Sequence, residues 1–394
     1  MFKDNSNPTM DELIHFLMVN HTELVDSMQN SYHAITTNEP NSYHSGDNSI
    51  WTHTMMVCLV AELNNFNKIV KIAALLHDIG KPIARTEEKW IDKPGRPVRK
   101  SGLKASFIGH EGLSSYISID ILNDLEKLEV INENDKNLIF SIISLHGSLF
   151  EYIGDSGLMI NTTKILRKFS YDMDLYSNLV NLVKCDSLGR FADNIDSRKN
   201  NANRLGLDVF TIDELANFNK NKRIDITPKT SEIVLLVGPQ GCGKSTFIKD
   251  EYKDYTIISR DSILLEYGKE KFGNIPYSEI WNLLDDGMQK EIDFIENNLF
   301  TRAVNNRENI VIDKTNISPK ARRRKIGQLP KSYKKVAILF LTGMKDLTRI
   351  SNERINLGDK LIDINLINKF IKGFTMVTHD EVDEIKYIWR KELK

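Results

Sequence analysis

Residues 238–246 constrain the fold of this chain more than any other segment. They read Gly-Pro-Gln-Gly-Cys-Gly-Lys-Ser-Thr and follow an apolar run, Ile233–Val237. Glycines let a backbone curl so that its N–H groups face phosphate oxygens, and a following helix adds its positive N-terminus. The succession of strand, glycine-rich loop and helix predicts an α/β domain with a phosphate-binding P-loop.

Within this loop, Lys244 would hold the β- and γ-phosphates of ATP, and Ser245 would reach Mg²⁺. A glycine-rich turn without a ligand is the alternative, but such a turn does not require Gly-Lys-Ser in that order. The expected nucleotide-binding residues are Gly238, Gly241, Cys242, Gly243, Lys244, Ser245 and Thr246.

Three further β-branched runs lie at Thr256–Ser259, Ile310–Asp313 and Val336–Leu341, with helical segments between them. Strands that alternate with helices predict a parallel sheet covered on both faces. The carboxyl ends of parallel strands face the ligand crevice. Asp261 follows one such end and could accept the proton of an attacking hydroxyl, or it could cap the next helix.

Basic and polar residues follow the later strands. Thr315 and Asn316 end the third run, and a basic run from Lys320 to Lys325 comes next. Such a run alone is usually a solvated face. Arg349 and Arg354 lie on a helical segment that could fold over the nucleotide as a lid, or they could be ordinary exposed arginines.

This order of motifs resembles the polynucleotide 5′-hydroxyl kinase family over residues 230–394. The resemblance implies that Asp261 is the general base, that Lys244 binds the triphosphate, and that Arg354 or Arg349 contacts the transferring phosphate. In the phage enzyme of this family an arginine follows the base by three residues, whereas Leu264 stands here. The acceptor contacts are therefore expected from Arg260, Thr315, Asn316, Arg322 and Arg323.

The N-terminal half carries polar residues on apolar helical faces. Up to about residue 190, apolar residues recur at three- and four-residue spacing, which predicts helices and no clear strand. His146, for example, is preceded at this spacing by Ile143, Ile142 and Ile139. The same pattern surrounds His53, His77, His110 and Asp186.

Buried polar groups need partners, and a divalent metal would satisfy several together. Imidazole and carboxylate ligands suit Mn²⁺, Co²⁺, Ni²⁺ or Zn²⁺. Any single histidine could instead be a hydrogen-bonded core residue. The candidate metal ligands are His53, His77, Asp78, His110, His146 and Asp186.

The stretch Leu-Leu-His-Asp-Ile-Gly-Lys-Pro at residues 75–82 resembles the HD phosphohydrolase superfamily, whose members are all-helical metal-dependent phosphoesterases. The resemblance implies His53, His77, Asp78 and Asp186 as primary ligands, with His110 and His146 as a second-metal or phosphate-binding pair. Gly109-His110-Glu111 is also similar to the HD domain of tRNA nucleotidyltransferases. Lys81, as a catalytic group, and Arg85 are the expected phosphate contacts.

An HD domain before a P-loop kinase resembles the bacterial HD-Pnk family of RNA end-healing enzymes. The expected fold is an all-α HD phosphoesterase domain at residues 1–200, a polar linker at 201–229 with a short helix at 211–218, and an α/β kinase domain at 230–394. The expected activities are phosphorylation of 5′-OH ends by ATP and removal of 2′,3′-cyclic, 2′- or 3′-phosphates.

The expected substrate is RNA, with DNA ends as an alternative. A separate RNA ligase is the expected partner, because the chain has no Lys-x-Asp-Gly ligase motif. With three cysteines, no signal peptide and no long apolar run, the chain is expected in the cytoplasm and not in a membrane. Its net charge of −1 limits nucleic-acid contacts to local basic patches.

Two other functions fit the same motifs. One is an HD nucleotidase fused to a small-molecule, nucleoside-type kinase. The other is a sensor in which ATP binding at Lys244 reports to an HD module that only binds a ligand. The segment 1–44 matches no motif, and His15, His21, His33 and His44 in it are expected to be non-catalytic.

Overall fold

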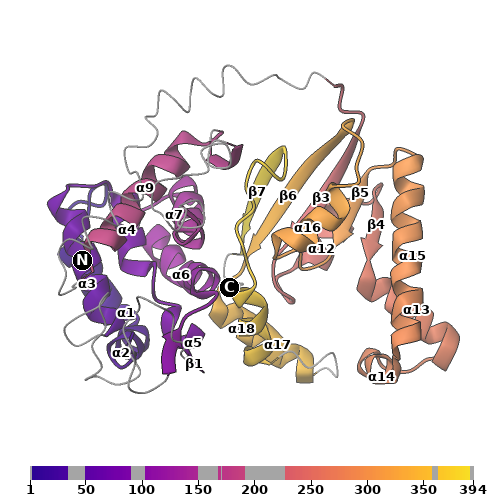
Figure 1. Cartoon of the computed structure of the whole chain (residues 1–394), viewed down its shortest axis with the longest axis horizontal. Helices are drawn as coiled ribbons and strands as arrows, with labels where there is room; N and C mark the ends of the chain where they lie inside the picture. The colour runs from indigo at the N-terminus through magenta and orange to yellow at the C-terminus, as the bar shows by residue number, and fades with distance from the viewer. Residues whose placement is uncertain are drawn as a thin grey trace. The chain divides into compact units, whose positions relative to one another are not determined.

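The computed structural model describes residues 2–33, 49–89, 103–149, 167–169, 171–190, 227–356 and 363–390. The chain divides into two compact units, Met1–Lys222 and Arg223–Lys394 (Figure 1). Most of the predicted linker at 201–229, including the short helix expected at 211–218, lies outside the described residues. Among the described helices, none is both long and apolar enough to cross a membrane.

The N-terminal unit is a bundle of helices. Its helices are α1 (Met10–Asn20), α2 (Thr22–Gln29), α3 (Ile50–Leu63), α4 (Lys68–Leu76), α5 (Lys81–Ala84), α6 (His110–Lys127), α7 (Glu133–Leu145) and α9 (Met173–Leu188). An antiparallel pair, β1 (Thr86–Lys89) and β2 (Leu103–Ser106), joins α5 to α6. The sequence did not predict this pair, because Thr-Glu-Glu-Lys is exposed and has no apolar alternation.

Polar caps fix where the ligand-bearing helices begin. The side chains of Asn67, Asn132 and Asp172 accept hydrogen bonds from the first turns of α4, α7 and α9, respectively. Such caps satisfy backbone donors that have no partner inside the helix. Inward faces of α7 and α9 are fully buried, including Ile142 and Leu182. Start points and apolar faces together determine which side chains point into the bundle.

The turn after His77 packs closely on α6. A Cβ at Gly80 would lie 2.5 Å from the backbone nitrogen of Ser114, so only glycine allows this approach. The Gly80 N–H donates to the hydroxyl of Ser114 at 3.0 Å. This contact sets the start of α6, where His110 lies, against the segment that carries Asp78.

The C-terminal unit is a parallel sheet with helices around it (Figure 1). Its strands are β3 (Ser231–Val237), β4 (Thr256–Ser259), β5 (Ile310–Asp313), β6 (Tyr333–Leu341) and β7 (Glu384–Trp389). Its helices are α12 (Lys244–Glu251), α13 (Arg260–Phe272), α14 (Tyr277–Leu283), α15 (Asp286–Asn305), α16 (Pro319–Ile326), α17 (Met344–Asn356) and α18 (Ile364–Lys372).

The five strands lie in the order β4-β5-β3-β6-β7, and each neighbouring pair is parallel. The connections therefore run to one side of β3 and then to the other. In open α/β sheets, ligands bind at the carboxyl ends of the strands where this order reverses. The P-loop follows β3 directly, so the topology places it at that point. The sequence predicted four of these strands and missed β7.

Arg322 connects α16 to the segment before β7. Its guanidinium is fully buried and binds both carboxylate oxygens of Glu381, at 2.8 and 2.7 Å. It also donates to the carbonyls of Asn316 and Thr375, each at 3.1 Å. A buried bidentate pair of this kind depends on both partners, because one alone would be an uncompensated charge.

We predict that Arg322→Ala lowers the free energy of unfolding of the C-terminal unit by about 3–5 kcal/mol, since it leaves Glu381 buried and unpaired. Urea denaturation followed by hydrogen exchange in β6 would measure the change. The matched control is Arg323→Ala, one residue away and exposed, which should change stability little. Equal effects of the two substitutions would contradict the prediction.

Candidate functional site

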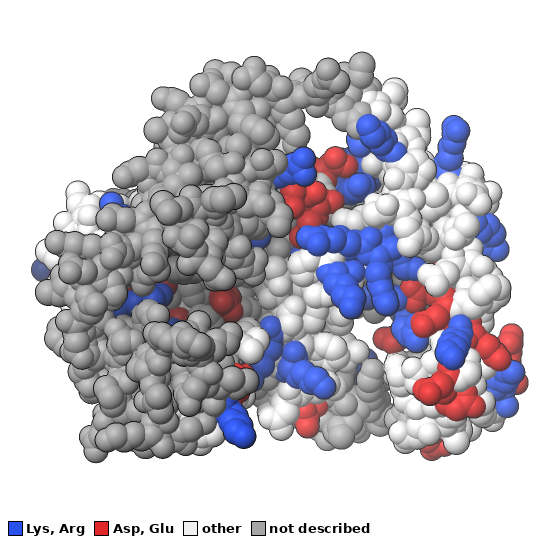
Figure 2. All heavy atoms as spheres, in the orientation of Figure 1, with Lys and Arg blue, Asp and Glu red and all other residues white. Residues whose placement is uncertain are grey.

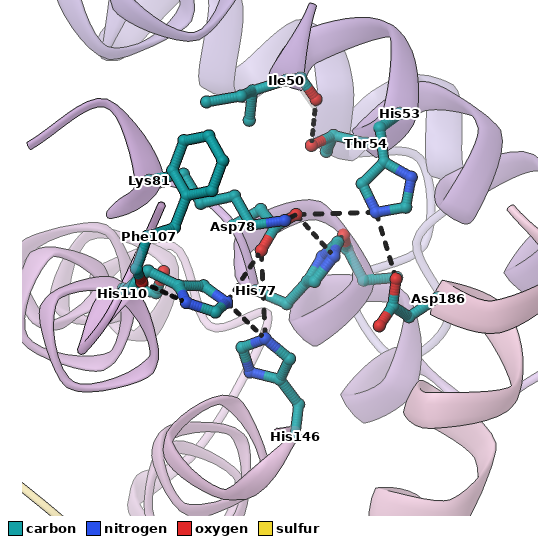
Figure 3. Close-up of polar contacts among 12 residues, drawn as sticks. Ile50, His53, Thr54, His77, Asp78, Lys81, Phe107, His110, His146 and Asp186 are labelled. Carbon is teal, nitrogen blue, oxygen red and sulfur yellow. Dashed lines mark hydrogen bonds and ion pairs between the residues drawn. The ribbon is translucent and has the colours of Figure 1, made fainter. Parts of the chain in front are cut away.

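The six predicted metal ligands lie together in the N-terminal unit (Figure 3). They form two groups, and within each group the ligand atoms all lie within 4.8 Å of one another. The first group is His53, His77 and Asp186, and the second is Asp78, His110 and His146. All come from different helices or their ends except His77 and Asp78, which are adjacent after α4.

Asp78 lies between the two groups, and each of its oxygens faces a different one (Figure 3). Its Oδ2 lies 3.5 Å from His53 Nε2, 3.2 Å from His77 Nε2 and 2.6 Å from Lys81 Nζ. Its Oδ1 lies 3.4 Å from His110 Nε2 and 3.9 Å from His146 Nε2. One carboxylate can therefore serve both groups.

Backbone carbonyls orient three of the four imidazoles. The Nδ1 atoms of these rings lie within hydrogen-bonding distance of a carbonyl three residues earlier in the chain. A carbonyl can only accept, so Nδ1 carries the proton and Nε2 keeps its lone pair. These pairs are His77 with Ala74 at 2.9 Å, His110 with Phe107 at 2.8 Å, and His146 with Ile143 at 2.6 Å.

The residues fit a bound divalent metal. In the described part of the chain, His77 Nε2 and Asp78 Oδ1 are buried and have no hydrogen-bond partner, and Asp78 Oδ2 is buried with an ion-pair contact to Lys81. Unsatisfied buried polar atoms are costly, and a cation would satisfy all three. Neutral imidazole and carboxylate donors suit Mn²⁺, Co²⁺, Ni²⁺ or Zn²⁺.

The charges of the cluster also suit a cation. Burial alone would raise the pKa of Asp78 and Asp186, but interactions with neighbouring side chains outweigh it and hold each pKa well below the ordinary value. For Asp78 these groups are His77 and Lys81, and for Asp186 the first is Arg190. Both carboxylates are thus ionised at neutral pH.

The histidines respond to burial and charge in different ways. Burial lowers the pKa of His53, and burial together with the charge of Lys81 lowers the pKa of His110 to about 4. Burial acts in the same direction on His77, but the adjacent Asp78 outweighs it and raises that pKa. Metal ligands must be free of protons at the binding atom, and the low pKa values of His53 and His110 meet this need.

Lys81 and Arg85, the two predicted phosphate contacts, differ in their surroundings. The Lys81 ammonium is 5.6 Å from the centre of the Phe107 ring, in addition to its contact with Asp78. Arg85 donates to the Tyr32 carbonyl at 3.2 Å and to Glu87 at 3.1 Å, so its guanidinium is partly engaged within the protein.

His33, which was expected to be non-catalytic, lies close to the cluster. Its ring contacts those of His53 and Phe107 edge-to-face, with centroids 5.6 and 5.4 Å apart. The buried His33 therefore borders the metal cluster. No sequence motif in this segment indicated that proximity.

The P-loop has the predicted shape. Gly243 has φ of 98°, a left-handed conformation that favours glycine, and it directly precedes α12. Lys244 is nearly buried, and its ammonium donates to the carbonyls of Gly238 and Pro239 at 2.9 and 2.7 Å. Ser245 and Thr246 are exposed in the first turn of α12. The loop thus presents a lysine and two hydroxyls at a helix N-terminus, as a triphosphate and Mg²⁺ require.

Asp261 lies in the first turn of α13, at the carboxyl edge of the sheet. Ser259 occupies the N-cap position, so Asp261 is not the cap residue. Its Oδ1 accepts a hydrogen bond from the hydroxyl of Tyr277 at 2.5 Å. Asp261 is exposed, which leaves its carboxylate accessible to an acceptor.

Two residues expected to bind substrate have structural roles instead, and we correct those predictions. Asn316 is nearly buried, and its amide donates to the carbonyls of Leu236 and Ile312 at 3.0 and 3.2 Å. It therefore ties the end of β5 to β3. Arg322 is occupied by Glu381, as described above. Neither side chain is available to a substrate.

The other predicted cations differ in their surroundings. Arg260 pairs with Asp293 and lies 3.7 Å from Glu296, while Arg323 is exposed on α16. The backbone carbonyl of Thr315 accepts from Gly238 N at 3.0 Å, and its partly exposed side chain lies beside the P-loop.

The predicted lid helix is α17. Cγ2 of Ile350 in this helix would be 3.6 Å from a Cβ at Gly241, so α17 lies against the P-loop. Arg349 pairs with Asp346 and Glu353, each at 2.8 Å, and Arg354 is partly exposed.

Two residues near the P-loop were not predicted. Asp313 ends β5, and burial raises its pKa despite the opposing effect of Lys244. The rule applied to Asp261, an acid at a strand's carboxyl end, would also have found Asp313. Arg390 follows β7 and donates to the Gly241 carbonyl at 3.4 Å. It was missed because β7 was missed.

Two known family models match this chain, one in each half. The HD domain model matches residues 47–184, and the AAA domain model matches residues 233–362. The chain joins an HD domain to an AAA-type P-loop domain. The predicted fold class is confirmed, and the HD-Pnk resemblance is confirmed at the level of these two domains.

Solved structures give weaker similarities. Two structures of the Pnkp1/Rnl/Hen1 complex, one described as an RNA repair complex, each share 20% sequence identity with this chain. Their TM-scores are 0.32 and 0.26, and they cover 39% and 32% of this chain. This chain spans less than half of each matched chain, 46% and 40%. A search of curated protein sequences finds no match.

We predict that Asp186→Asn lowers the affinity of the HD domain for Mn²⁺ by about 100-fold or more, since even the loss of an outer-shell partner costs about 10- to 100-fold. Metal content after dialysis and calorimetric titration would measure the change. Asp174→Asn, an exposed change on the same helix, is the control and should bind as wild type does. Equal affinities in the two variants would contradict the assignment of Asp186.

Proposed function

We propose that this protein heals the ends of broken RNA. Its kinase domain would transfer the γ-phosphate of ATP to a 5′-OH end, and its HD domain would remove a 2′,3′-cyclic, 2′- or 3′-phosphate. The proposal is supported by two features of one chain. One is a cluster around Asp78 whose residues could hold a metal, and the other is a P-loop with an accessible carboxylate, Asp261, at the same sheet edge. Cleavage of RNA by many nucleases leaves these two kinds of end.

In the HD domain, the residues around Asp78 would hold the substrate phosphate. A divalent ion bound there would activate a water molecule and neutralise phosphate charge. Lys81 is placed 2.6 Å from Asp78 and partly exposed, so its ammonium could contact a phosphate oxygen at the edge of the cluster. Arg85 could add a second contact through the part of its guanidinium that is exposed.

In the kinase domain, the acceptor and the nucleotide would meet at the carboxyl edge of the sheet. Asp261 would take the proton of the 5′-OH as its oxygen attacks the γ-phosphorus. The bond from that phosphorus to the β–γ bridging oxygen breaks, and ADP leaves. Lys244 would exchange its loop carbonyls for phosphate oxygens, and Arg354 or Arg349 would balance the charge that develops on the transferring group.

A polymer substrate is supported by the basic face of α16. Lys320, Arg323 and Arg324 on this helix are exposed, and such groups bind phosphate backbones. Figure 2 shows Lys and Arg side chains gathered near the middle of the visible face of the C-terminal unit, with acidic groups beside them. Sealing of the healed ends would need a separate ligase, and we place the reaction in the cytoplasm.

Two single substitutions test the proposal. Asp261→Ala should lower 5′-phosphorylation of a 5′-OH oligoribonucleotide about 100- to 10,000-fold, because it removes the general base. It should leave removal of the terminal phosphate unchanged. Asp78→Ala should abolish phosphate removal and leave the kinase intact. Retained ATP binding by Asp261→Ala and an unchanged unfolding transition of the N-terminal unit in Asp78→Ala would show that each altered domain is folded. Both activities can be followed on one labelled RNA.

The outcomes separate the alternatives. Loss of both activities in either variant, with the protein still folded, would contradict two independent sites. Faster turnover of nucleosides and mononucleotides than of oligonucleotides would favour a nucleotidase joined to a small-molecule kinase. A wild-type protein that binds ATP but transfers no phosphate and retains no metal would favour a ligand sensor.

A further inference from the structure

The strongest observation outside the predicted residues concerns α14. This helix packs against α13, and α13 in turn packs against α15, which contacts β4 (Figure 1). The three helices share their own apolar core, formed by Ile263, Leu264, Tyr267, Ile280 and Ile292. Tyr277, the first residue of α14, packs on this core and directs its hydroxyl to Asp261.

Leu264 explains why the acceptor site needs another contact. It lies three residues after Asp261, and its side chain is only 2% exposed, inside this core. A charged residue at this position would be buried away from the sheet edge, so the position cannot supply an acceptor contact. Arg260, on the other side of Asp261, is paired with Asp293 in α15. Leu264 is thus part of the apolar core, and Arg260 is engaged in an ion pair.

Two aromatic residues of α14, Tyr277 and Trp281, are the remaining candidates for an acceptor contact near Asp261. Trp281 follows Tyr277 by one helical turn, and their ring centroids are 6.4 Å apart at 71°. Trp281 is 36% exposed, unusually open for so large an apolar side chain. Trp281 is therefore linked to Asp261 through Tyr277, which contacts both. Exposed aromatic rings are surfaces on which nucleobases stack, and stacking requires no particular base.

We propose that α14 forms the acceptor subsite of the kinase domain, with Trp281 stacking on the 5′-terminal nucleobase and Tyr277 positioning Asp261. This inference rests on the proposed kinase activity. The Tyr277 hydroxyl holds Oδ1 of Asp261, which leaves Oδ2 to receive the proton of the 5′-OH. The ligand class is a 5′-OH nucleotide end with an intact base.

The two residues have separable effects. Trp281→Ala raises the KM for a 5′-OH oligonucleotide about 10-fold, the size expected for one lost stacking contact, and leaves kcat and the KM for ATP unchanged. Tyr277→Phe keeps the ring and the packing but removes the hydroxyl. It lowers kcat about 10-fold without changing the KM, because the carboxylate is no longer held in place.

A second substrate tests the stacking contact directly. An acceptor whose 5′-terminal nucleotide is abasic raises the KM of wild type to the value that Trp281→Ala shows with a normal acceptor. On the abasic acceptor, Trp281→Ala has the same KM as wild type. Leu283→Ala, an exposed apolar change at the end of the same helix, is the matched control and behaves as wild type. An unchanged KM for ATP reports that the kinase domain of each variant is folded.

Two results would overturn the inference. The first is an equal KM increase from Trp281→Ala on normal and abasic acceptors. The second is wild-type kinetics in both Trp281→Ala and Tyr277→Phe. Both require a wild-type protein that phosphorylates oligonucleotides. If wild type transfers no phosphate to any 5′-OH acceptor, the proposed function itself has failed, and the two failures are thereby distinguished.

Discussion

The buried carboxylate of Asp78 is the constraint around which the N-terminal unit is arranged. Removing an ionised carboxylate from water costs several kcal/mol unless charged or polar partners compensate it. Here each oxygen faces a separate histidine group, and Lys81 lies 2.6 Å away. Helix caps, the close approach at Gly80 and the carbonyls that hold the imidazoles all place these partners. The positions of the cluster residues thus depend on where the helices begin and on how closely they pack.

The C-terminal unit places its candidate site at an accessible sheet edge and not in a buried cluster. Its ligands would lie at an accessible sheet edge, where strand order reverses beside β3. The P-loop backbone and α12 supply fixed dipoles for phosphate. Asp313 ends β5, and Asp261 lies in the first turn of α13, which follows the neighbouring strand β4. A buried cluster suits a bound cation, and an open edge suits two substrates that must enter and leave.

Much of this arrangement could be predicted from local sequence. Helical spacing indicated that His53, His77, His110, His146 and Asp186 point inward, and the loop motif with its preceding strand indicated the P-loop. The division of Asp78 between two histidine groups could not be predicted, because it depends on how α4, α6 and α7 pack. Arg322 illustrates the opposite error. Within a basic run it was predicted to contact the acceptor, but it is buried against Glu381, which is 59 residues away in the sequence. Tyr277 reaches Asp261 only through the packing of α14.

The central claim is that one chain processes both ends of a broken RNA. The most direct measurement is mass spectrometry of one oligoribonucleotide with a 5′-OH and a 2′,3′-cyclic phosphate, incubated with the wild-type protein, ATP, Mg²⁺ and Mn²⁺. We predict a product that has gained a 5′-phosphate and lost its 3′-terminal phosphate. Recovery of the RNA with either end unchanged, under conditions where the protein is folded and binds metal and ATP, would contradict it.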